Sequence, residues 1–393
     1  MFKENKNLLV IALIAVVNAL GYGIIIPILY SYSVKYGLND FQNGLLFATF
    51  SLCQFLSTPI IGRLSDKYGR RPLLLLSLSG TVLSFILMAF APNAIFLFIA
   101  RALDGMTAGN IPVATAVITD TTPPKDRAKG FGIIGAAFGF GFIFGPIISA
   151  RTVDLNASYP FIIAAGISLL AVIITAIFLT ETNQHIGETK HDKLFDFGKL
   201  IHALTNKTIG ATLILTLLYF TAFSMFIYAF QSSAVKIYHM SAGQISLVFT
   251  LFGIIGLISQ VVLVGLVTKT FGVKKTFMTS LLGVAISFIA MYFTTTVPAF
   301  VIANVVLGFV NAYVQPLSLT ILSEETDPKE QGEMQGINAS YMSIGQIIGP
   351  ILAGVAATFS VSSPFIGAGI LTFVCYFLSF EIFAHLPKKT IKP

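Results

Sequence analysis

Two oppositely charged residues, Arg101 and Asp104, stand inside an otherwise apolar stretch that runs from about residue 94 to 118. Residues three apart share one face of a helix, and a helix crossing a membrane would hold Asp104 roughly 15 Å deep. An ionisable side chain at that depth costs on the order of 3 kcal/mol and is functional by default. A carboxyl beside a cation keeps both protonation states accessible. We therefore predict that Asp104 is protonated reversibly and that Arg101 stabilises its charge; an ion pair that only locks two helices together is the structural alternative.

A second group of charged residues lies in the segment GRLSDKYGRRP, residues 62–72, between two apolar stretches of about 20 residues each. Charges this close together cannot lie in hydrocarbon, so the segment predicts a tight turn at a membrane face. Asp66 and Arg70 supply opposite charges in it, and Gly62 and Gly69 are typical of turns and close packing. These charges either carry a function or only fix the topology and the shape of the turn.

Neutral polar side chains inside other apolar stretches form a third group of candidates. An amide such as Asn18 is costly in hydrocarbon unless it is hydrogen-bonded, so it requires a partner or a ligand. The second half of the chain offers amides and aromatic rings but no charge at a comparable depth. With one anionic group, these side chains predict a largely apolar ligand that is cationic or zwitterionic. The residues that we predict to bind the ligand are Asn18, Tyr22, Arg101, Asp104, Gln231, Asn311, Gln315 and Asn338.

The composition indicates which elements must hold these residues in place. Of the 393 residues 55% are hydrophobic and 10% are charged, and the mean hydropathy is +0.85, whereas soluble domains have about 25% charged residues. Stretches long enough for a transmembrane helix occur at approximately 8–30, 42–62, 72–91, 94–118, 130–150, 159–180, 208–235, 243–267, 275–293, 297–322, 333–356 and 363–385. The predicted fold class is therefore an all-α polytopic membrane protein with twelve transmembrane helices.

The placement of positive charge predicts the orientation of these helices. With the N-terminus inside, every Lys and Arg falls on a cytoplasmic segment except Lys35, Arg151, Lys236 and the membrane-embedded Arg101. The positive-inside rule then places both termini in the cytoplasm, in a multi-pass protein of the cell (inner) membrane. The net charge of +7 thus indicates topology and contact with anionic lipid, and nucleic acid is not an expected partner.

The chain repeats itself with an offset of about 203 residues. The paired residues include Gly62 with Gly265, Gly69 with Gly272, Pro112 with Pro316, Gly145 with Gly349 and Pro146 with Pro350. Glycines and prolines that recur in one register make accidental similarity improbable, and two related halves are typical of secondary transporters. The predicted domains are an N-terminal six-helix bundle (1–180), a cytoplasmic linker (181–207) and a C-terminal six-helix bundle (208–393).

Five segments resemble the major facilitator superfamily, and within it the drug:proton antiporters, particularly the tetracycline-efflux-like members. These segments are NALGYGIIIPIL, GRLSDKYGRRP, ARALDGMTAG, ITDTTPPKDRAKGFG and GIIGAAFGFGFIFGP. The resemblance implies the fold of that superfamily, with two pseudo-symmetric six-helix bundles, and it associates Arg101 with proton coupling. It also implies a gate, a charge cluster of Asp66, Arg70 and Asp120 on the cytoplasmic side, with Gly62 and Gly69 in the same loop.

The fifth predicted span resembles the glycine motif that is associated with antiporters. Gly141 and Gly145 precede Pro146 there, and glycines at this spacing allow close helix packing and a hinge. The eleventh span repeats the pattern at Gly349 and Pro350. A purely symmetrical packing role is therefore the alternative to a role in antiport.

The chain departs from the tetracycline-efflux-like pattern at two places. Asn18 stands where those proteins have an acid, and Ser149 and Ala150 replace the expected pair of glycines. An amide hydrogen-bonds a ligand but carries no proton. Proton coupling is therefore predicted at Asp104, with Arg101.

These features predict a secondary active transporter that exports a small amphipathic or drug-like compound by proton antiport with alternating access. One alternative is a proton-coupled or facilitative transporter of a small anionic metabolite or sugar, in which Arg101 clamps the substrate. Another is a membrane receptor or lipid-handling protein. The sequence has no P-loop and no catalytic constellation, so we expect no enzyme activity, no cofactor and no metal. The expected form is a monomer in the lipid bilayer whose partners are a small-molecule substrate and protons.

Overall fold

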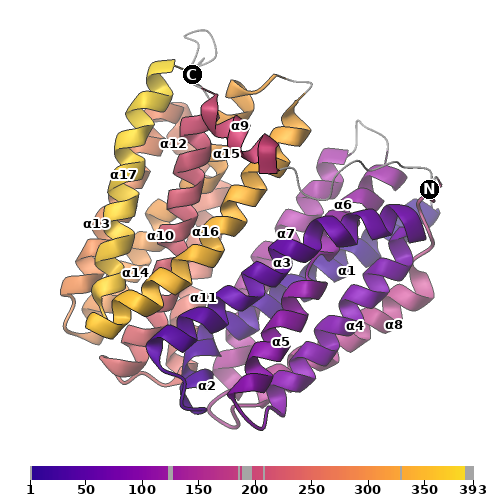
Figure 1. Ribbon diagram of the computed structural model, residues 1–393, viewed down its shortest axis with the longest axis horizontal. Coiled ribbons are helices and arrows are strands. Elements are labelled where there is room, and N and C mark those ends of the chain that lie inside the picture. The colour runs from indigo at the N-terminus through magenta and orange to yellow at the C-terminus, as the bar shows by residue number, and fades with distance from the viewer. Residues whose placement is uncertain are drawn as a thin grey trace. The chain divides into compact units, whose positions relative to one another are not determined.

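The computed structural model describes the backbone of residues 2–122, 127–184, 186–187, 197–206, 209–327 and 330–385. All regular structure in these ranges is helical (Figure 1). Twelve spans have the length and hydropathy needed to cross a membrane, so the predicted all-α polytopic fold class is confirmed. Residues 123–126 of the predicted motif after span 4 and both chain ends lie outside the described residues.

Spans 1 and 4 in the first half of the chain are interrupted helices. Span 1 passes from α1 (Phe2–Ile25) through the 3₁₀ turn η1 (Ile26–Ile28) into α2 (Leu29–Val34). The turn contains Pro27, which has no N–H to donate and disfavours helical geometry in the residue before it. Span 4 is divided into α5 (Ala94–Thr107) and α6 (Asn110–Thr121). The remaining spans are α3 (Asp40–Tyr68), α4 (Arg70–Ala89), α7 (Arg127–Thr152) and α8 (Tyr159–Phe178).

The second half of the chain also forms six spans. Its helices are α10 (Ile209–Lys236), α11 (Ala242–Ile258), α12 (Val264–Phe271), α13 (Val273–Phe293), α14 (Val297–Asn311), α15 (Val314–Glu325), α16 (Gln331–Phe359) and α17 (Ser363–His385). A π-helical turn, η3 (Ser259–Leu263), joins α11 to α12. Span 10 is divided into α14 and α15, as span 4 is divided into α5 and α6.

Helix packing follows the internal repeat. In the first half, α1 packs against α7 and α8, and α4 packs against α5 and α8. In the second half, α10 packs against α16 and α17, and α13 packs against α14 and α17. Gly69 and Gly272 precede α4 and α13 with φ angles of 101° and 80°, a conformation that favours glycine. The equivalent turns therefore have the same backbone geometry.

The chain forms two compact units. Unit 1 comprises Met1–Leu38, Thr49–Phe195 and Met240–Thr250, and unit 2 comprises Asn39–Ala48, Asp196–His239 and Leu251–Pro393. Each unit thus includes the first residues of one helix, α3 or α11, whose remainder belongs to the other unit. The three-part division into 1–180, 181–207 and 208–393 stays a prediction.

One helix was not predicted from the sequence. The expected linker, 181–207, contains the short helix α9 (Phe197–Thr205), whose sequence FGKLIHALT has apolar residues three and four apart, the spacing of one helix face. Ala203 of α9 is buried against Ile209 and Leu213 of α10. Residues 188–196 of the linker lie outside the described residues.

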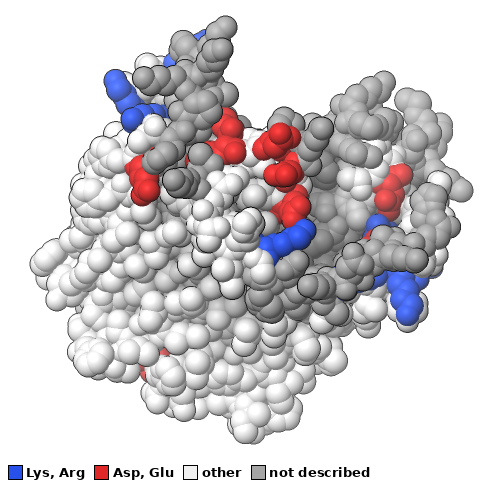
Figure 2. Space-filling view, turned by 45° about the horizontal axis from the view of Figure 1, so that its top comes forward, with Lys and Arg blue, Asp and Glu red and all other residues white. Residues whose placement is uncertain are grey.

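The core of unit 1 lies where α1, α4 and α6 meet. Ile11, Ile14, Leu74 and Val117 are almost fully buried in it. Large apolar side chains on the opposite helix faces stay exposed, as expected where lipid replaces water. In Figure 2 nearly all of the visible Lys, Arg, Asp and Glu side chains lie in the upper part of the view, and most of the other described surface in this view is uncharged.

Candidate functional site

Arg101 and Asp104 lie one turn apart on α5 and face each other. The helix begins after Asn93, whose side chain accepts a hydrogen bond from the N–H of Ile95. Arg101 Nη1 lies 3.4 Å from Asp104 Oδ2. The two side chains retain only 3% and 11% of their exposure, so this ion pair is almost completely withdrawn from solvent in unit 1.

An aromatic wall completes the surroundings of Arg101. Its guanidinium carbon lies 4.4 Å from the centre of the Phe50 ring on α3, a geometry in which the ring face attracts the cation. Tyr22 of α1 contacts Phe50, with ring centroids 6.2 Å apart, and also contacts Phe142 of α7. A Cβ on Gly105 would lie 2.3 Å from the backbone oxygen of Phe50. The glycine therefore permits the close approach of α5 and α3 that brings Phe50 to Arg101.

Asn18 has a protein partner in the membrane. Its Nδ2 donates to Asn110 Oδ1 over 2.9 Å, and Asn110 Nδ2 donates back to Asn18 Oδ1 over 3.0 Å. Asn110 is the first residue of α6 and is 1% exposed. The pair of amides satisfies the polar groups that hydrocarbon would leave unpaired, and it joins α1 to the start of α6.

The predicted binding residues of unit 2 lie in different surroundings. The Tyr219 hydroxyl donates to Asn311 Oδ1, which joins α10 to α14. Gln231 is fully buried, and its Nε2 donates to the backbone oxygen of Ile227 in the same helix. Gln315 and Asn338 line one small pocket together with Tyr219. The structure thus brings three of these residues together and leaves Gln231 apart from them.

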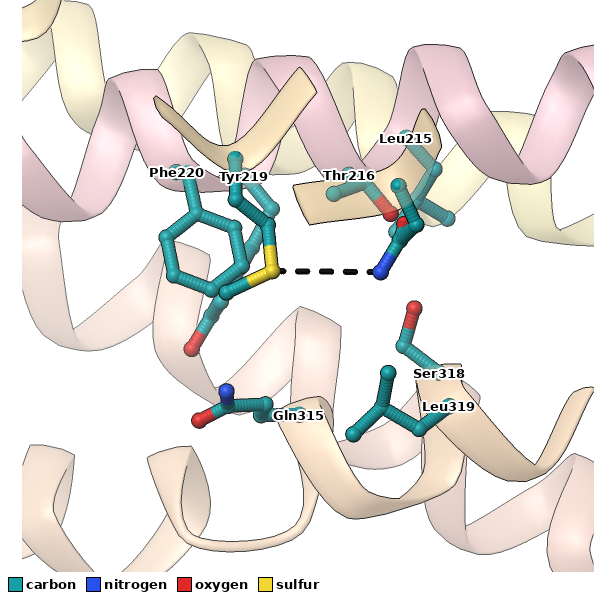
Figure 3. Close-up of a pocket in the computed structure, with 9 residues that line it drawn as sticks. Leu215, Thr216, Tyr219, Phe220, Gln315, Ser318 and Leu319 are labelled. Atoms are coloured by element: carbon teal, nitrogen blue, oxygen red, sulfur yellow. Dashed lines mark hydrogen bonds between the residues drawn. The ribbon is translucent and has the colours of Figure 1, made fainter. Parts of the chain in front are cut away.

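The pocket of unit 2 lies between three helices. Its lining residues are Leu215, Thr216, Tyr219 and Phe220 of α10, Gln315, Ser318 and Leu319 of α15, and Asn338 and Met342 of α16. Figure 3 shows the α10 side chains facing those of α15 across it. The cavity volume is about 10 Å³, which is close to the least that holds a water molecule.

The predicted gate residues form one connected cluster in unit 1. Arg70 binds Asp66, one helical turn before it, and its Nε lies 3.2 Å from Asp120 Oδ2 at the end of α6. Arg70 Nη1 also donates to the hydroxyl of Ser65, which is fully buried. The cluster links the end of α3, the start of α4 and the end of α6. Gly62 lies inside α3 and not in the predicted loop. Its backbone oxygen accepts a hydrogen bond from the Ser65 hydroxyl over 2.6 Å, and a Cβ at this position would meet open space.

Sequence analysis missed one residue of this cluster, Glu181. Its carboxylate accepts hydrogen bonds from the backbone N–H groups of Arg70 and Arg71, over 2.9 and 3.1 Å, and so caps the start of α4. Carboxylates are favourable at helix N-termini because the free N–H groups and the helix dipole attract negative charge. A Cβ on Gly69 would lie 2.4 Å from Glu181 Oε2, so the glycine also makes room for the cap.

The hydrogen bonds to Glu181 change its acidity. Partial burial by itself raises the pKa of this carboxyl, but backbone N–H groups of Asn183, Arg70, Arg71 and Thr182 donate to it, and together they lower the pKa below its usual value of 4.5.

The residues next to Glu181 form hydrogen bonds with the other members of the cluster. Thr182 Oγ1 donates to Asp120 Oδ2 and Asn183 Nδ2 to the backbone oxygen of Asp66. The segment after α8 is therefore hydrogen-bonded to residues at the end of α3, the start of α4 and the end of α6.

The predicted packing glycines lie at the closest helix contacts. A Cβ on Gly141 would meet Ala19, and one on Gly145 would meet Gly23, both within 3 Å. Gly349 of α16 lies in the same way against Thr221 of α10. The predicted hinge prolines, Pro146 and Pro350, stand inside the continuous helices α7 and α16.

Comparison with known proteins identifies the family. The model of the Major Facilitator Superfamily matches residues 11–232 and 212–392. The tetracycline resistance protein, class H, of Pasteurella multocida is 29% identical over 91% of this chain and 90% of its own length. Multidrug resistance protein 1 of Bacillus subtilis (strain 168) is 30% identical over 93% of each chain.

A solved structure shares the fold. The crystal structure of a peptide transporter, POT, superposes with a TM-score of 0.81 over 99% of this chain and 96% of that chain, at 14% identity. The match along the whole chain agrees with the paired packing of α1 with α7 and of α10 with α16, and with the division of both span 4 and span 10 into two helices. The chain therefore belongs to the major facilitator superfamily and is a multi-pass membrane transporter rather than an enzyme.

Proposed function

We propose that this transporter exports a small amphipathic or drug-like compound in exchange for protons, by alternating access. Relatives that cover nine-tenths of the chain bear the names tetracycline resistance protein and multidrug resistance protein. The observation that carries the proposal is the Arg101–Asp104 pair, buried inside a transmembrane span of unit 1. A buried acid beside a buried cation has the chemistry that reversible protonation requires.

In this proposal, Asp104 takes up and releases the driving proton. As a carboxylate it is held by Arg101, and when it is protonated the ion pair is lost while the guanidinium keeps its contact with the Phe50 ring. The substrate and the proton then compete for the same group, the Asp104 carboxylate. One proton moving down 100 mV supplies about 2.3 kcal/mol, which sustains a gradient of roughly 50-fold.

The cluster of Asp66, Arg70 and Asp120 serves as the gate of the cytoplasmic side in this proposal. Partly exposed charge pairs contribute about 0 to 1 kcal/mol each, so a cluster of them is able to break and re-form in every transport cycle. In this proposal both termini lie inside the cell. That orientation puts Lys35, Arg151 and Lys236 outside and the other loop cations inside, as the positive-inside rule requires.

Accumulation in cells tests export. Cells that express the protein are loaded with tetracycline or with the fluorescent cation ethidium, before and after an uncoupler collapses the proton gradient. We expect lower accumulation than in cells with an empty vector, and a rise to the empty-vector level after the uncoupler. Accumulation above the empty-vector level before the uncoupler, falling when it is added, would mean import and would contradict the proposal.

One observation favours a second candidate, a transporter of a small anionic metabolite. Arg101 Nε is buried and has no hydrogen-bond partner among the described residues, so the guanidinium retains a donor with which it would hold a carboxylate or phosphate. Arg101→Lys keeps the positive charge but loses the planar fork. A loss of transport confined to anionic compounds in this variant would favour the second candidate.

A further inference from the structure

The pocket of unit 2 contains two buried polar atoms that the described part of the chain leaves unpaired. Asn338 is 3% exposed, and its Oδ1 has no hydrogen-bond partner among the described residues. Thr216 is also 3% exposed, and its hydroxyl lacks a partner in the same sense. Both residues line the pocket. Buried polar atoms in proteins are nearly always hydrogen-bonded, so an unpaired pair in one cavity calls for an occupant.

The donor side of the Asn338 amide is almost equally unsatisfied. Its Nδ2 has one contact with a described residue, the Met342 sulfur at 3.8 Å, and a thioether is a weak acceptor. Figure 3 shows this contact as a dashed line beside the labelled side chains of Tyr219 and Phe220. The amide therefore offers an acceptor oxygen and an NH₂ group with two N–H donors, of which one makes only this weak contact; another amide complements this pattern.

None of the described residues that line the pocket is charged, and its walls are partly aromatic. Tyr219 and Phe220 lie on one side, with Leu215 and Leu319 adding apolar surface. The Tyr219 hydroxyl is engaged by Asn311, so the ring is held in place. A cation or an anion would be desolvated here without a counter-charge, which is costly. A neutral planar group that donates hydrogen bonds is able to bond the unpaired polar atoms and to pack against the aromatic rings.

We propose that this pocket is a substrate subsite that recognises a neutral hydrogen-bond donor group, a carboxamide or a hydroxyl, through Asn338 Oδ1 and the Thr216 hydroxyl. The inference rests on the proposed function, because it names the chemistry of one end of the exported compound. In the present structure the cavity has room for about one water molecule. The substrate group displaces that water and the Met342 side chain, which is flexible.

The test measures the binding of small probes to the purified full-length protein in detergent. Binding is detected by ligand-observed NMR, and empty micelles serve as the blank. Three probes with the same number of non-hydrogen atoms differ only in the group at issue: benzamide is a neutral donor, acetophenone has a methyl group in place of the NH₂ and donates no hydrogen bond, and benzamidinium is a cation. We expect the wild type to bind benzamide at least about threefold more tightly than either of the other two, the factor that one lost hydrogen bond gives.

Two variants and two controls locate the site. Thr216→Val and Asn338→Leu each remove one of the unpaired atoms, and each should weaken benzamide binding by about threefold or more. Thr372→Val is the matched control, because Thr372 is fully buried in α17 and its hydroxyl bonds the backbone of its own helix; it should leave binding unchanged. Thr216→Ser, which keeps the hydroxyl, should bind as the wild type does.

An acid at position 338 tests the claim of neutrality. Asn338→Asp should reverse the preference, so that benzamidinium binds more tightly than benzamide. The inference is wrong if benzamide does not bind the wild type, if Thr216→Val and Thr372→Val behave alike, or if benzamidinium binds the wild type best. A pocket that holds only a structural water would give the second of these results. None of these measurements uses a proton gradient. Their outcome therefore tests the subsite even if proton antiport fails in cells.

Discussion

Two pairs of polar residues lie inside the transmembrane spans of unit 1. Asn18 and Asn110 exchange two hydrogen bonds, and Arg101 lies between Asp104 and the ring of Phe50. Hydrocarbon offers no alternative partner, so each of these contacts replaces water. The departure from the tetracycline-efflux-like pattern at Asn18 is thus matched by an amide at position 110, and an acid in place of Asn18 would leave that amide with a different partner.

The amide pair predicts a coupling between two sites. Asn18→Leu leaves the Asn110 amide buried without its partner and should lower the free energy of unfolding, whereas Asn18→Leu with Asn110→Leu should cost less than the sum of the single changes. The expected coupling is roughly 0.5 to 2 kcal/mol, the range for hydrogen bonds between transmembrane helices. Unfolding by denaturant in detergent for the four proteins of the cycle measures it. Strict additivity would show that the pair contributes nothing.

At the level of helices, glycine positions decide how closely α1 and α7 approach. A Cβ on Gly141 would lie 2.3 Å from the Cβ of Ala19, while Gly135 of the same helix has open space at that position. Both glycines lie inside α7, but only Gly141 has another helix close to the position of a Cβ. A comparison of them therefore separates helix packing from helix propensity.

Gly141→Ala should destabilise the protein by about 1 to 3 kcal/mol, because α1 and α7 must move apart to admit the methyl group. Gly135→Ala should have no such cost and should stabilise slightly, since alanine is the better helix former. Thermal melting in detergent compares the two variants. If both shift the melting temperature equally, close packing at Gly141 is not the cause of its effect.

The Glu181 cap predicts a dependence on pH. Because the folded state lowers the pKa of this carboxyl, its stabilising effect is present above the usual pKa of 4.5 and is lost as the pH falls through the lowered value. Glu181→Gln should therefore melt at a lower temperature than the wild type at pH 7, and the difference should shrink towards pH 4. Glu330→Gln is the control for the hydrogen bonds, because Glu330 also stands at a helix N-terminus, that of α16, but is exposed and makes no side-chain cap hydrogen bond; its effect on melting should be smaller. A constant difference across the pH range would show that the charge of Glu181 is unimportant.

At the scale of the whole molecule, the sequence was sufficient to predict the fold class. The twelve spans follow from long apolar stretches, and the superfamily follows from the resemblance of five segments to its motifs. The helix α9 was missed because nine residues in a polar segment give a weak signal. Glu181 was missed because it caps a helix 111 residues earlier in the chain, a distance over which a sequence pattern carries no information.

The candidate site was predictable in kind but not in its contacts. Arg101 and Asp104 stand out because charges are rare in apolar stretches, and their facing geometry follows from a spacing of three. Neutral residues give no such signal: Gln231 and Asn338 look equivalent in sequence, yet one bonds its own helix and the other lines a pocket. Thr216, a common residue type in a span, had no distinguishing feature at all.

The proposed orientation of the molecule predicts which positions an external reagent reaches. In a background of Cys53→Ser and Cys375→Ser, single cysteines at Leu155, which is 76% exposed, and at Gln184, also exposed, should lie on opposite sides of the membrane. A membrane-impermeant maleimide should label Leu155→Cys in intact cells and Gln184→Cys only in inverted vesicles. The reverse pattern would place the termini outside.

Proton carriage by Asp104 is the central claim, and transport by Asp104→Asn in proteoliposomes tests it most directly. With tetracycline as the probe, the variant should fail to transport against a gradient when a pH difference is imposed, while exchange of labelled for unlabelled tetracycline continues, because asparagine keeps the shape but cannot release a proton. Glu330→Gln, the same exchange of acid for amide at an exposed site, should transport as the wild type does. Uphill transport by Asp104→Asn at the wild-type rate would contradict the account.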